Sequence, residues 1–237
     1  MAETAAHVAD FVDSALPAGH MFQGGYEIAD PIGRGSFSTV YRARQLSTGQ
    51  DVAIKLLGPL RDEQGDDRGN SARFRREMQL CGELYHPHIV PLIDCGEAED
   101  GRLYAVFQFV PGQTLRGLLA AEGCLSLAET SRLMIDVLDA LSCAHAHGIA
   151  HRDLKPENIM VARAGARRHA LVLDFGLGGL VQEAYAHGAP GSDGAREMLG
   201  TPSYAAPEQL RGELPSNCIN PQVLPRFMER HRQAQRG

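Results

Sequence analysis

The stretch His151-Arg152-Asp153-Leu154-Lys155-Pro156-Glu157-Asn158 decides how this sequence is interpreted. It follows a predicted helix that stops at Gly148 and precedes a short apolar segment, so we expect a loop held on a rigid scaffold. The loop offers a carboxylate that can take a proton from a hydroxyl group and an ammonium that can neutralise a phosphoryl group. It also offers an amide oxygen that can bind a hard cation such as Mg²⁺. A polar surface turn is the alternative, and eight residues in this order speak against it.

Two further motifs follow downstream. Asp174-Phe175-Gly176 comes after the apolar run Leu171-Val172-Leu173, which places an aspartate at the end of a buried strand, where it suits a metal ligand. A strand-ending turn is the alternative, because Asp-Phe-Gly alone is common. Residues 200–208, Gly-Thr-Pro-Ser-Tyr-Ala-Ala-Pro-Glu, would on their own be a proline-containing loop.

A glycine-rich turn and a lysine in a strand lie upstream. Residues 33–38, Gly-Arg-Gly-Ser-Phe-Ser, join two predicted strands, and glycines let a backbone bend closely over a phosphate chain. A plain hairpin is the alternative. Lys55 ends the apolar run Val-Ala-Ile-Lys, where a lysine that reaches solvent from an edge strand is the ordinary explanation. We expect Lys55 instead to pair with a carboxylate, that of Glu77 or, as the rival, that of Glu83.

Lysine usage points to the same motifs. Of the 23 basic residues only Lys55 and Lys155 are lysines. In a composition that favours arginine, the remaining lysines mark positions where an ammonium is needed and a guanidinium does not serve. Both fall inside candidate motifs, so their scarcity supports a site.

Composition narrows the class of protein. The chain has 237 residues, of which 43% are hydrophobic and 22% charged, as in a globular protein. Its net charge of −6 argues against nucleic-acid binding as the main role, and no apolar run approaches the ~18 residues of a membrane helix. Residues 1–19 contain no basic residue, so a secretion signal is not expected. Five scattered cysteines favour free thiols in a reducing cytoplasm.

The predicted elements divide the chain into a strand-rich first part and a helix-rich second part. A hinge is expected at 109–113, and ligands favour the seam between two such parts. Thr114 and Ser126 are predicted helix N-caps, and Glu129 has capping-box spacing from Ser126. The predicted apolar stripe of the second helix is Leu133, Val137, Leu138 and Leu141. One strand is predicted at 26–32 and a second directly after the glycine turn. Further strands are predicted at 51–57, 86–97, 101–110, 158–162 and 170–176. Helices are predicted at 72–85, 114–123 and 126–148.

In this order and at this spacing, the motifs resemble the eukaryotic-type protein kinase domain from about residue 26 to about residue 210. Residues 151–158 resemble the serine/threonine branch, and GTPSYAAPEQL (200–210) resembles bacterial members. The resemblance implies an α+β, bilobal protein-kinase-like fold with a β-rich N-lobe and a helical C-lobe that lacks its distal helices. The implied domains are a flexible N-terminal tail over 1–25, the N-lobe over 26–108, a partial C-lobe over 109–210 and a non-matching basic tail over 211–237.

The resemblance also implies roles for individual residues. Asp153 would orient the substrate hydroxyl and take its proton, and Lys155 would steady the γ-phosphate of ATP. Lys55 would hold the α- and β-phosphates and pair with Glu77. Thr201 would help to seat the substrate, and Asn158 with Asp174 would hold Mg²⁺. Phe107 would be the gatekeeper, and the backbones of Gln108 and Val110 would bond to adenine. The other implied nucleotide-binding residues are Ile32, Gly33, Gly35, Ser38, Val40 and Ala53.

Three departures from the family pattern stand out. Ser38 replaces the third glycine of the usual loop, a change that working kinases tolerate. The segment 177–199 has no threonine. The resemblance implies that Arg152 binds an activating phosphate carried by this segment. Either Ser192 would receive that phosphate, or regulation by phosphorylation is missing here. No aspartate follows Asp193, although the family needs one in its next helix. We expect a truncated or frame-shifted chain with a non-native tail; the alternative is a reduced kinase whose tail replaces the missing helices.

These features predict a cytoplasmic signalling enzyme, a serine/threonine protein kinase that uses Mg²⁺ and ATP. Its partners would be proteins with serine or threonine acceptors, without nucleic acid or a membrane segment, and its oligomeric state stays open. The first alternative is a catalytically impaired or pseudokinase-like fragment that binds nucleotide and acts by binding. The second is a small-molecule phosphotransferase of kinase-like fold, which the Ala-Pro-Glu end of the 174–208 segment disfavours.

Overall fold

The structure is a computed structural model that describes residues 15–35, 38–58, 68–177 and Tyr204. The described residues form two compact units. The first contains those up to Met78 together with Leu92–Phe109, and the second contains Gln79–Pro91 and those from Val110 onward. Thr201, Ser192 and the segment 211–237, for which the sequence makes predictions, lie outside the described residues.

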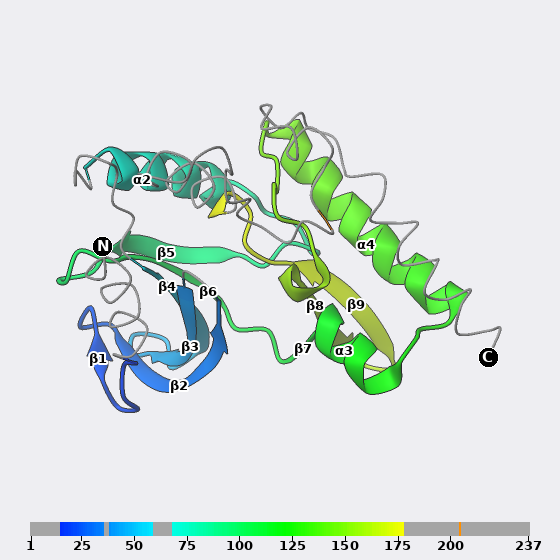
Figure 1. Ribbon diagram of the computed structural model, residues 1–237, viewed down its shortest axis with the longest axis horizontal. Coiled ribbons are helices and arrows are strands. Elements are labelled where there is room, and N and C mark those ends of the chain that lie inside the picture. Colours follow the sequence, from blue (N-terminus) through cyan, green and yellow to red (C-terminus); the bar gives the residue numbers. More distant parts are fainter. Residues whose placement is uncertain (1–14, 36–37, 59–67, 178–203, 205–237) are drawn as a thin grey trace, which may run out of the picture. The chain divides into compact units, whose positions relative to one another are not determined.

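The first unit is a curled antiparallel sheet with a helix (Figure 1). In its described residues the strands follow the order β1-β2-β3-β4-β6-β5. The sheet is built mostly from neighbours along the chain, as short turns between antiparallel strands allow. The elements are β1 (Met21–Phe22), β2 (Tyr26–Arg34), β3 (Ser38–Gln45), β4 (Asp51–Leu57), α2 (Arg68–Gly82), β5 (Leu92–Glu97) and β6 (Leu103–Gln108).

Alternation along β4 determines which face of the sheet forms the core. Val52, Ile54 and Leu56 are buried, at 0%, 0% and 2% exposure, and join the hydrophobic cluster of this unit. Ala53 and Lys55 lie between them and are half-buried, because successive side chains of a strand point to opposite faces. The predicted bounds of this strand, 51–57, are confirmed. Lys55 therefore lies on the face opposite that core.

The sheet begins earlier than the sequence indicated. We expected residues 1–25 to be a flexible tail, but β1 pairs with β2 and Gly19 N donates to the carbonyl of Ile28 at 2.8 Å. Phe22 is 4% exposed, and its ring meets the ring of Tyr104 edge-on, with 5.0 Å between centroids. Burial of one such side chain contributes about 1.5–3 kcal/mol, which anchors the described part of this segment to the sheet.

The second unit combines helices with a small antiparallel sheet of order β7-β8-β9. Helix α4 runs along the β8–β9 hairpin (Figure 1), and the backbone N–H of Ala170 donates to Asp136 Oδ2 at 2.9 Å. Gly112 has no room for a side chain, because a Cβ there would clash with the carbonyl oxygen of Val161. The elements are β7 (Gly112–Thr114), α3 (Leu115–Glu122), α4 (Leu127–Ala146), the 3-10 helix η1 (Pro156–Asn158), β8 (Ile159–Ala164) and β9 (Arg167–Val172).

Both predicted helix caps are confirmed. Thr114 Oγ1 accepts from Gly117 N at 3.1 Å, and Ser126 Oγ accepts from Glu129 N at 3.2 Å. Each bond satisfies an amide that has no partner within its helix. The carboxylate of Glu129 accepts instead from Arg168, so the side chain at the capping-box position ties α4 to the hairpin.

The buried stripe of α4 differs from the prediction at one position. Leu133, Val137 and Leu141 are buried as expected, but Leu138 is 38% exposed. Each residue turns the helix by about 100°, so Leu138 is rotated away from the line of Leu133, Val137 and Leu141. The stripe is completed by Met134, Ala140 and Ala144.

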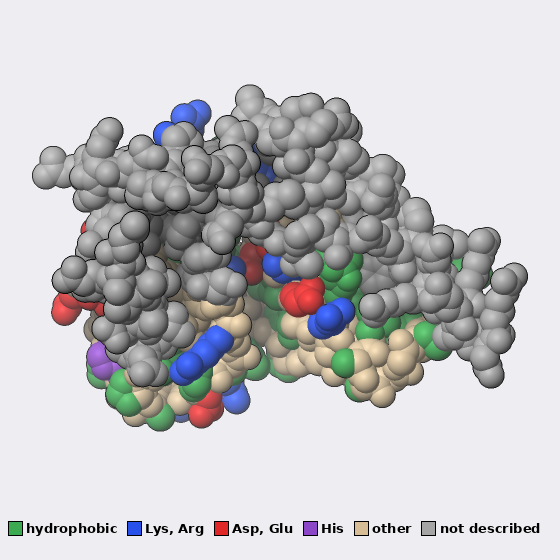
Figure 2. Space-filling model, in the orientation of Figure 1, with side chains coloured by type: hydrophobic (Ala, Val, Ile, Leu, Met, Phe, Trp, Pro, Cys, Tyr) green, Lys and Arg blue, Asp and Glu red, His purple; other side chains and the backbone are tan. Residues whose placement is uncertain are grey.

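On the face drawn in Figure 2, acidic and basic side chains are interspersed, so the described surface there is neither mainly acidic nor mainly basic. Among the described residues, no helix has the length and apolar character that crossing a membrane requires.

Candidate active site

The loop between α4 and β8 brings three predicted site residues together. Asn158 Nδ2 donates to the backbone carbonyl of Asp153 at 2.8 Å and to its carboxylate Oδ2 at 3.2 Å. Lys155 Nζ lies 2.7 Å from the same Oδ2. The two side chains of this ion pair are only 21% and 28% exposed, so the surrounding water screens their interaction less than on an open surface. The sequence predicted the three residues, and the structure shows that they contact one another.

His151 fixes the backbone of this loop through hydrogen bonds. Its side chain is 4% exposed, and Nε2 donates to the carbonyl of Leu173 at 2.8 Å. Nδ1 accepts from the backbone N–H of Asp153 at 3.3 Å, and the ring meets that of Phe175 edge-on at 4.9 Å. Burial lowers the pKa of His151, so the ring is neutral and each nitrogen fits its partner. A neutral imidazole thus fixes the backbone of Asp153 against the end of β9.

Two site residues adopt left-handed backbone conformations. Arg152 has a φ of 63° and Asp174 a φ of 62°. Such geometry costs on the order of 1–3 kcal/mol for a residue with a side chain, and it clusters at functional sites. The N–H of Leu173 donates to the carbonyl of Asn158 at 2.9 Å. This bond joins the residue before Asp174 to the loop that contains Asp153 and Asn158. Asp153 and Asp174 both lie close enough to His151 to act on its pKa, after the larger effect of burial.

The two predicted metal ligands, Asn158 and Asp174, carry side-chain oxygen atoms of the kind that Mg²⁺ binds. Because Asn158 Nδ2 donates to Asp153, the amide oxygen of Asn158 is left as an acceptor. Asp174 supplies a carboxylate just beyond β9. Mg²⁺ binds proteins through one or two such oxygens and completes its shell with water and substrate phosphates. The described residues contain no group of three or more His, Cys, Asp or Glu placed to hold a metal.

In the first unit, three predicted nucleotide-binding residues share one face of the sheet. Val40 is the cross-strand partner of Lys55, and Ala53 is the partner of Phe107. Opposite residues of antiparallel strands point to the same side, and Lys55 is two residues from Ala53. Val40, Ala53 and Lys55 therefore lie together on the face opposite the hydrophobic cluster, joined there by Phe107.

The predicted glycine loop is described on both sides of residues 36–37. Gly33 pairs with Val40, and Gly35 N donates to the carbonyl of Ser38 at 2.8 Å, so Gly35 and Ser38 lie side by side. A Cβ on Gly35 would lie 3.4 Å from Ser38 Oγ. The side chain of Ser38, at the position where the family pattern has its third glycine, thus lies beside Gly35. Ile32 is 49% exposed on β2.

The remaining predicted nucleotide-binding residues lie on separate elements. Glu77 is half-buried on α2, and its pairing with Lys55 stays a prediction. Gln108 is exposed at the end of β6, and Phe107 is 8% exposed. Val110 belongs to the second unit. The adenine-binding roles of Gln108 and Val110 stay predictions as well.

Sequence reasoning gave no role to two residues that support the site. One is His151, whose bonds join positions 22 residues apart in the chain. The other is Cys81, whose Sγ donates to the carbonyl of Phe175 at 3.1 Å across 94 residues. Only the place of His151 inside the motif could have indicated it, and no sequence signal marks Cys81.

Comparison with known proteins agrees with this geometry. The profile of the protein kinase domain matches residues 26–218. It therefore includes residues 211–218, the beginning of the segment that the sequence motifs leave unmatched.

The most similar proteins include bacterial kinases. The chain is 40% identical over 188 residues to serine/threonine-protein kinase pkn3 of Myxococcus xanthus, covering 79% of this chain and 34% of that protein. It is 38% identical over 191 residues to serine/threonine-protein kinase PknB of Mycolicibacterium smegmatis, covering 79% of this chain and 29% of that protein. It thus spans about a third of the length of these relatives.

A solved structure shows the same fold. The crystal structure of the kinase domain of Mycobacterium tuberculosis PknI matches with a TM-score of 0.64 and 27% identity, covering 86% of this chain and 72% of that one. The predicted fold, a β-rich lobe and a helical lobe of protein-kinase type, is confirmed.

Proposed function

The chain belongs to the protein kinase domain family, and from that membership we propose that it transfers the γ-phosphoryl group of Mg-ATP to serine and threonine hydroxyls of proteins. The observation that carries the proposal is the cluster in which Lys155 and Asn158 both contact the carboxylate of Asp153. A carboxylate held in this way presents its remaining lone pairs to a hydroxyl in a fixed direction.

The proposed reaction is a single displacement at the γ-phosphorus. The hydroxyl oxygen of the substrate forms a bond to that phosphorus while the bond to the β–γ bridging oxygen breaks, and ADP leaves with the electron pair. The hydroxyl proton passes to the carboxylate of Asp153. His151 and Asn158 are positioning residues here, because they hold the backbone and the carboxylate of Asp153. Positioning of this kind can supply much of the catalysis.

Charge stabilisation is assigned to the two lysines. Lys155 lies beside Asp153 and would bind the γ-phosphoryl oxygens, where negative charge is present during transfer. Lys55, on the face of the first sheet that carries Val40 and Ala53, would bind the α- and β-phosphates. Asn158 and Asp174 would hold Mg²⁺, which when bound supplies positive charge to the phosphate oxygens.

The finer parts of the proposal concern the acceptor and the compartment. Protein acceptors with serine or threonine follow from the relatives, which are named serine/threonine-protein kinases. The cytoplasm supplies ATP, and Cys81, Cys95, Cys124 and Cys143 are free thiols, as expected in a reducing compartment.

The proposal is tested by incubating the chain with Mg-ATP labelled at the γ-phosphate and a peptide library with serine and threonine acceptors. A matched library with alanine at those positions is the control. Label in the first library and none in the second supports the proposal. Thermal stabilisation by Mg-ATP with no label in either library would overturn it in favour of a role in binding alone.

A further inference from the structure

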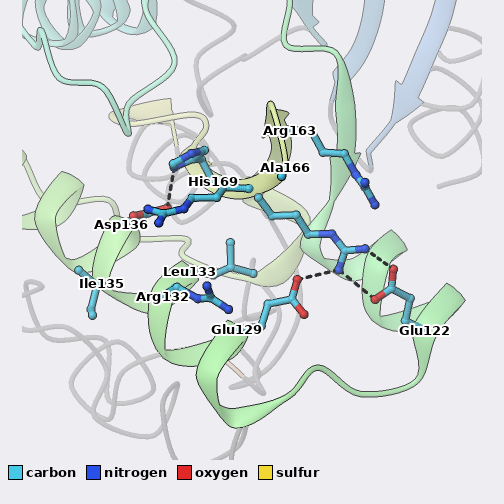
Figure 3. A pocket seen from close by; sticks show the side chains of 11 residues that line it. Glu122, Glu129, Arg132, Leu133, Ile135, Asp136, Arg163, Ala166 and His169 are labelled. Carbon is cyan, nitrogen blue, oxygen red and sulfur yellow. Dashed lines mark hydrogen bonds and ion pairs between the residues drawn. The ribbon is translucent and has the colours of Figure 1, made fainter.

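The second unit has a hollow away from the residues of the candidate active site. It lies between the β8–β9 hairpin, the first turns of α4 and the end of α3, and its volume is about 590 Å³ (Figure 3). Most of the described residues that line it are charged, and Leu133, Ile135 and Ala166 add an apolar part. Its volume falls within the range of ligand sites, about 300–1,000 Å³.

The acidic side chains of this hollow already have partners. Arg168 Nη1 donates to Glu122 Oε2 at 3.0 Å and to Glu129 Oε1 at 2.8 Å. The bond from Arg168 lowers the pKa of Glu122, so that carboxylate stays ionised and paired. Asp136 accepts from Ala170 N at 2.9 Å. It also lies 3.5 Å from His88 Nε2 and 3.9 Å from His169 Nδ1. One arginine and two histidines thus engage every carboxylate that the described lining supplies.

In contrast to these carboxylates, the arginines of the hollow other than Arg168 form no ion pair with another described residue. Arg163 and Arg167 are exposed, and neither forms an ion pair or hydrogen bond with a carboxylate of the described residues, although the charge of Arg163 contributes to lowering the pKa of Glu122. Arg132 donates Nε to the carbonyl of Ala128 at 3.1 Å, which leaves both its Nη groups as donors. Arg163 stands directly opposite Arg168 in the β8–β9 register, although like charges at such positions are unfavourable. Apart from Arg168, the guanidinium groups of the hollow thus form no ion pair with its carboxylates, on a chain whose net charge is −6.

The spacing of these arginines fits an extended ligand. Arg163 lies on the hairpin, and Arg132 lies across the hollow on α4, with Glu129 beside it (Figure 3). A single phosphate would need its guanidinium groups to converge on one point. Arginines spread along a hollow instead match carboxylates spaced along a peptide. Ile135, which is 63% exposed, adds an apolar contact of the kind that peptide grooves use.

We propose that this hollow binds an acidic peptide segment of a partner protein through Arg132, Arg163 and Arg167. The binding surface is independent of the phosphoryl-transfer residues, so it goes beyond the proposed function, and either can fail without the other. Electrostatic attraction would speed the encounter and select acidic segments over basic ones.

The test measures binding of fluorescein-labelled hexaglutamate to the full chain by fluorescence anisotropy, with hexaglutamine as the uncharged probe. The chain is compared with the double variant Arg163→Glu/Arg167→Glu and with Arg44→Glu, which changes an exposed arginine of β3 outside the hollow. We expect hexaglutamate to bind the double variant at least about tenfold more weakly, since repulsion replaces attraction. We expect no change for Arg44→Glu, and little binding of hexaglutamine.

Two further measurements make the result decisive. The double variant should gain affinity for labelled hexalysine. It should also label the serine and threonine library at the wild-type rate, which unfolding would abolish. Equal hexaglutamate affinity of the wild type and the double variant would overturn the proposal, because binding would then occur elsewhere. Equal weakening by Arg44→Glu, or equal binding of hexaglutamine, would overturn it too.

Discussion

The ammonium of Lys155 lies 2.7 Å from carboxylate Oδ2 of Asp153, the oxygen that also accepts from Asn158 Nδ2 at 3.2 Å. One carboxylate oxygen therefore has two donors, and both come from the same short loop. In the proposed mechanism, the second oxygen, Oδ1, is therefore the one left to accept the proton of the substrate hydroxyl. This arrangement makes the loop a unit in which each side chain positions another.

Replacing Lys155 by arginine should lower the phosphoryl-transfer rate by about 10- to 100-fold. The ammonium is a compact charge, whereas a guanidinium at this place is larger and donates in a planar fork. Lys55→Arg should have a similar effect. The initial rate on the serine and threonine library measures both, and Arg44→Lys, on an exposed strand position, is the matched control. Near-wild-type rates for both lysine variants would contradict the roles given to the two lysines.

Replacing Asn158 by aspartate separates its two roles. The carboxylate can still bind Mg²⁺, but it cannot donate to Asp153 and repels it. We expect the maximal rate to fall by about 100-fold or more, with the Mg²⁺ concentration at half-maximal rate changed little. Asn158→Ala should lower the rate and also raise the Mg²⁺ requirement. If the aspartate variant keeps the wild-type rate, the bond from Asn158 to Asp153 has no role in positioning.

The stability of the fold should fall as the pH drops below 6.5, the ordinary pKa of histidine. Burial lowers the pKa of His151 in the folded state, so below pH 6.5 the unfolded chain binds a proton that the folded chain refuses. Stability is then lost with falling pH, with a slope of at most about 1.4 kcal/mol per pH unit from this one group.

Urea unfolding between pH 5 and pH 7.5 checks this expectation. His151→Gln keeps a donor and an acceptor but does not titrate, so the variant should show a smaller loss of stability at acidic pH than the wild type. Equal pH dependence of the two proteins, or a wild type that gains stability on acidification relative to the variant, would contradict the burial of a neutral His151.

Two leucines of α4 provide a matched pair for core packing. Leu141 is 2% exposed and Leu138 is 38% exposed. Leu141→Ala should lower the free energy of unfolding by about 2–5 kcal/mol, since it leaves a cavity. Leu138→Ala should cost less than about 1 kcal/mol, since its side chain already contacts solvent. Chemical denaturation measures both, and a larger loss for Leu138→Ala would show that α4 buries a different face.

Local rules predicted the parts of the fold that depend on neighbours in the chain. The apolar character of residues 51–57 predicted the bounds of β4, and the oxygens of Thr114 and Ser126 predicted the starts of α3 and α4. The motif order predicted that Asp153 and Asn158 belong to one site, and the structure places them in contact, because family resemblance already carries the spatial information that a single sequence lacks.

The remaining features depend on contacts between distant residues. The pairing of β1 requires Tyr104 to cover Phe22, and nothing near Phe22 in the sequence indicates that. The left-handed conformation of Arg152 is likewise invisible in the sequence, since glycine is the residue that usually marks it. The bond from His151 to Leu173 joins two elements that only the folded chain brings together.

The central claim is that Asp153 takes the proton from a protein hydroxyl during phosphoryl transfer. Its most direct test is the rate of γ-phosphate transfer to the serine and threonine library by the wild type and by Asp153→Ala at saturating Mg-ATP. Loss of a general base should lower the rate by about 100- to 10,000-fold, while the dissociation constant of Mg-ATP changes little. Equal transfer rates for the two proteins would contradict the assignment.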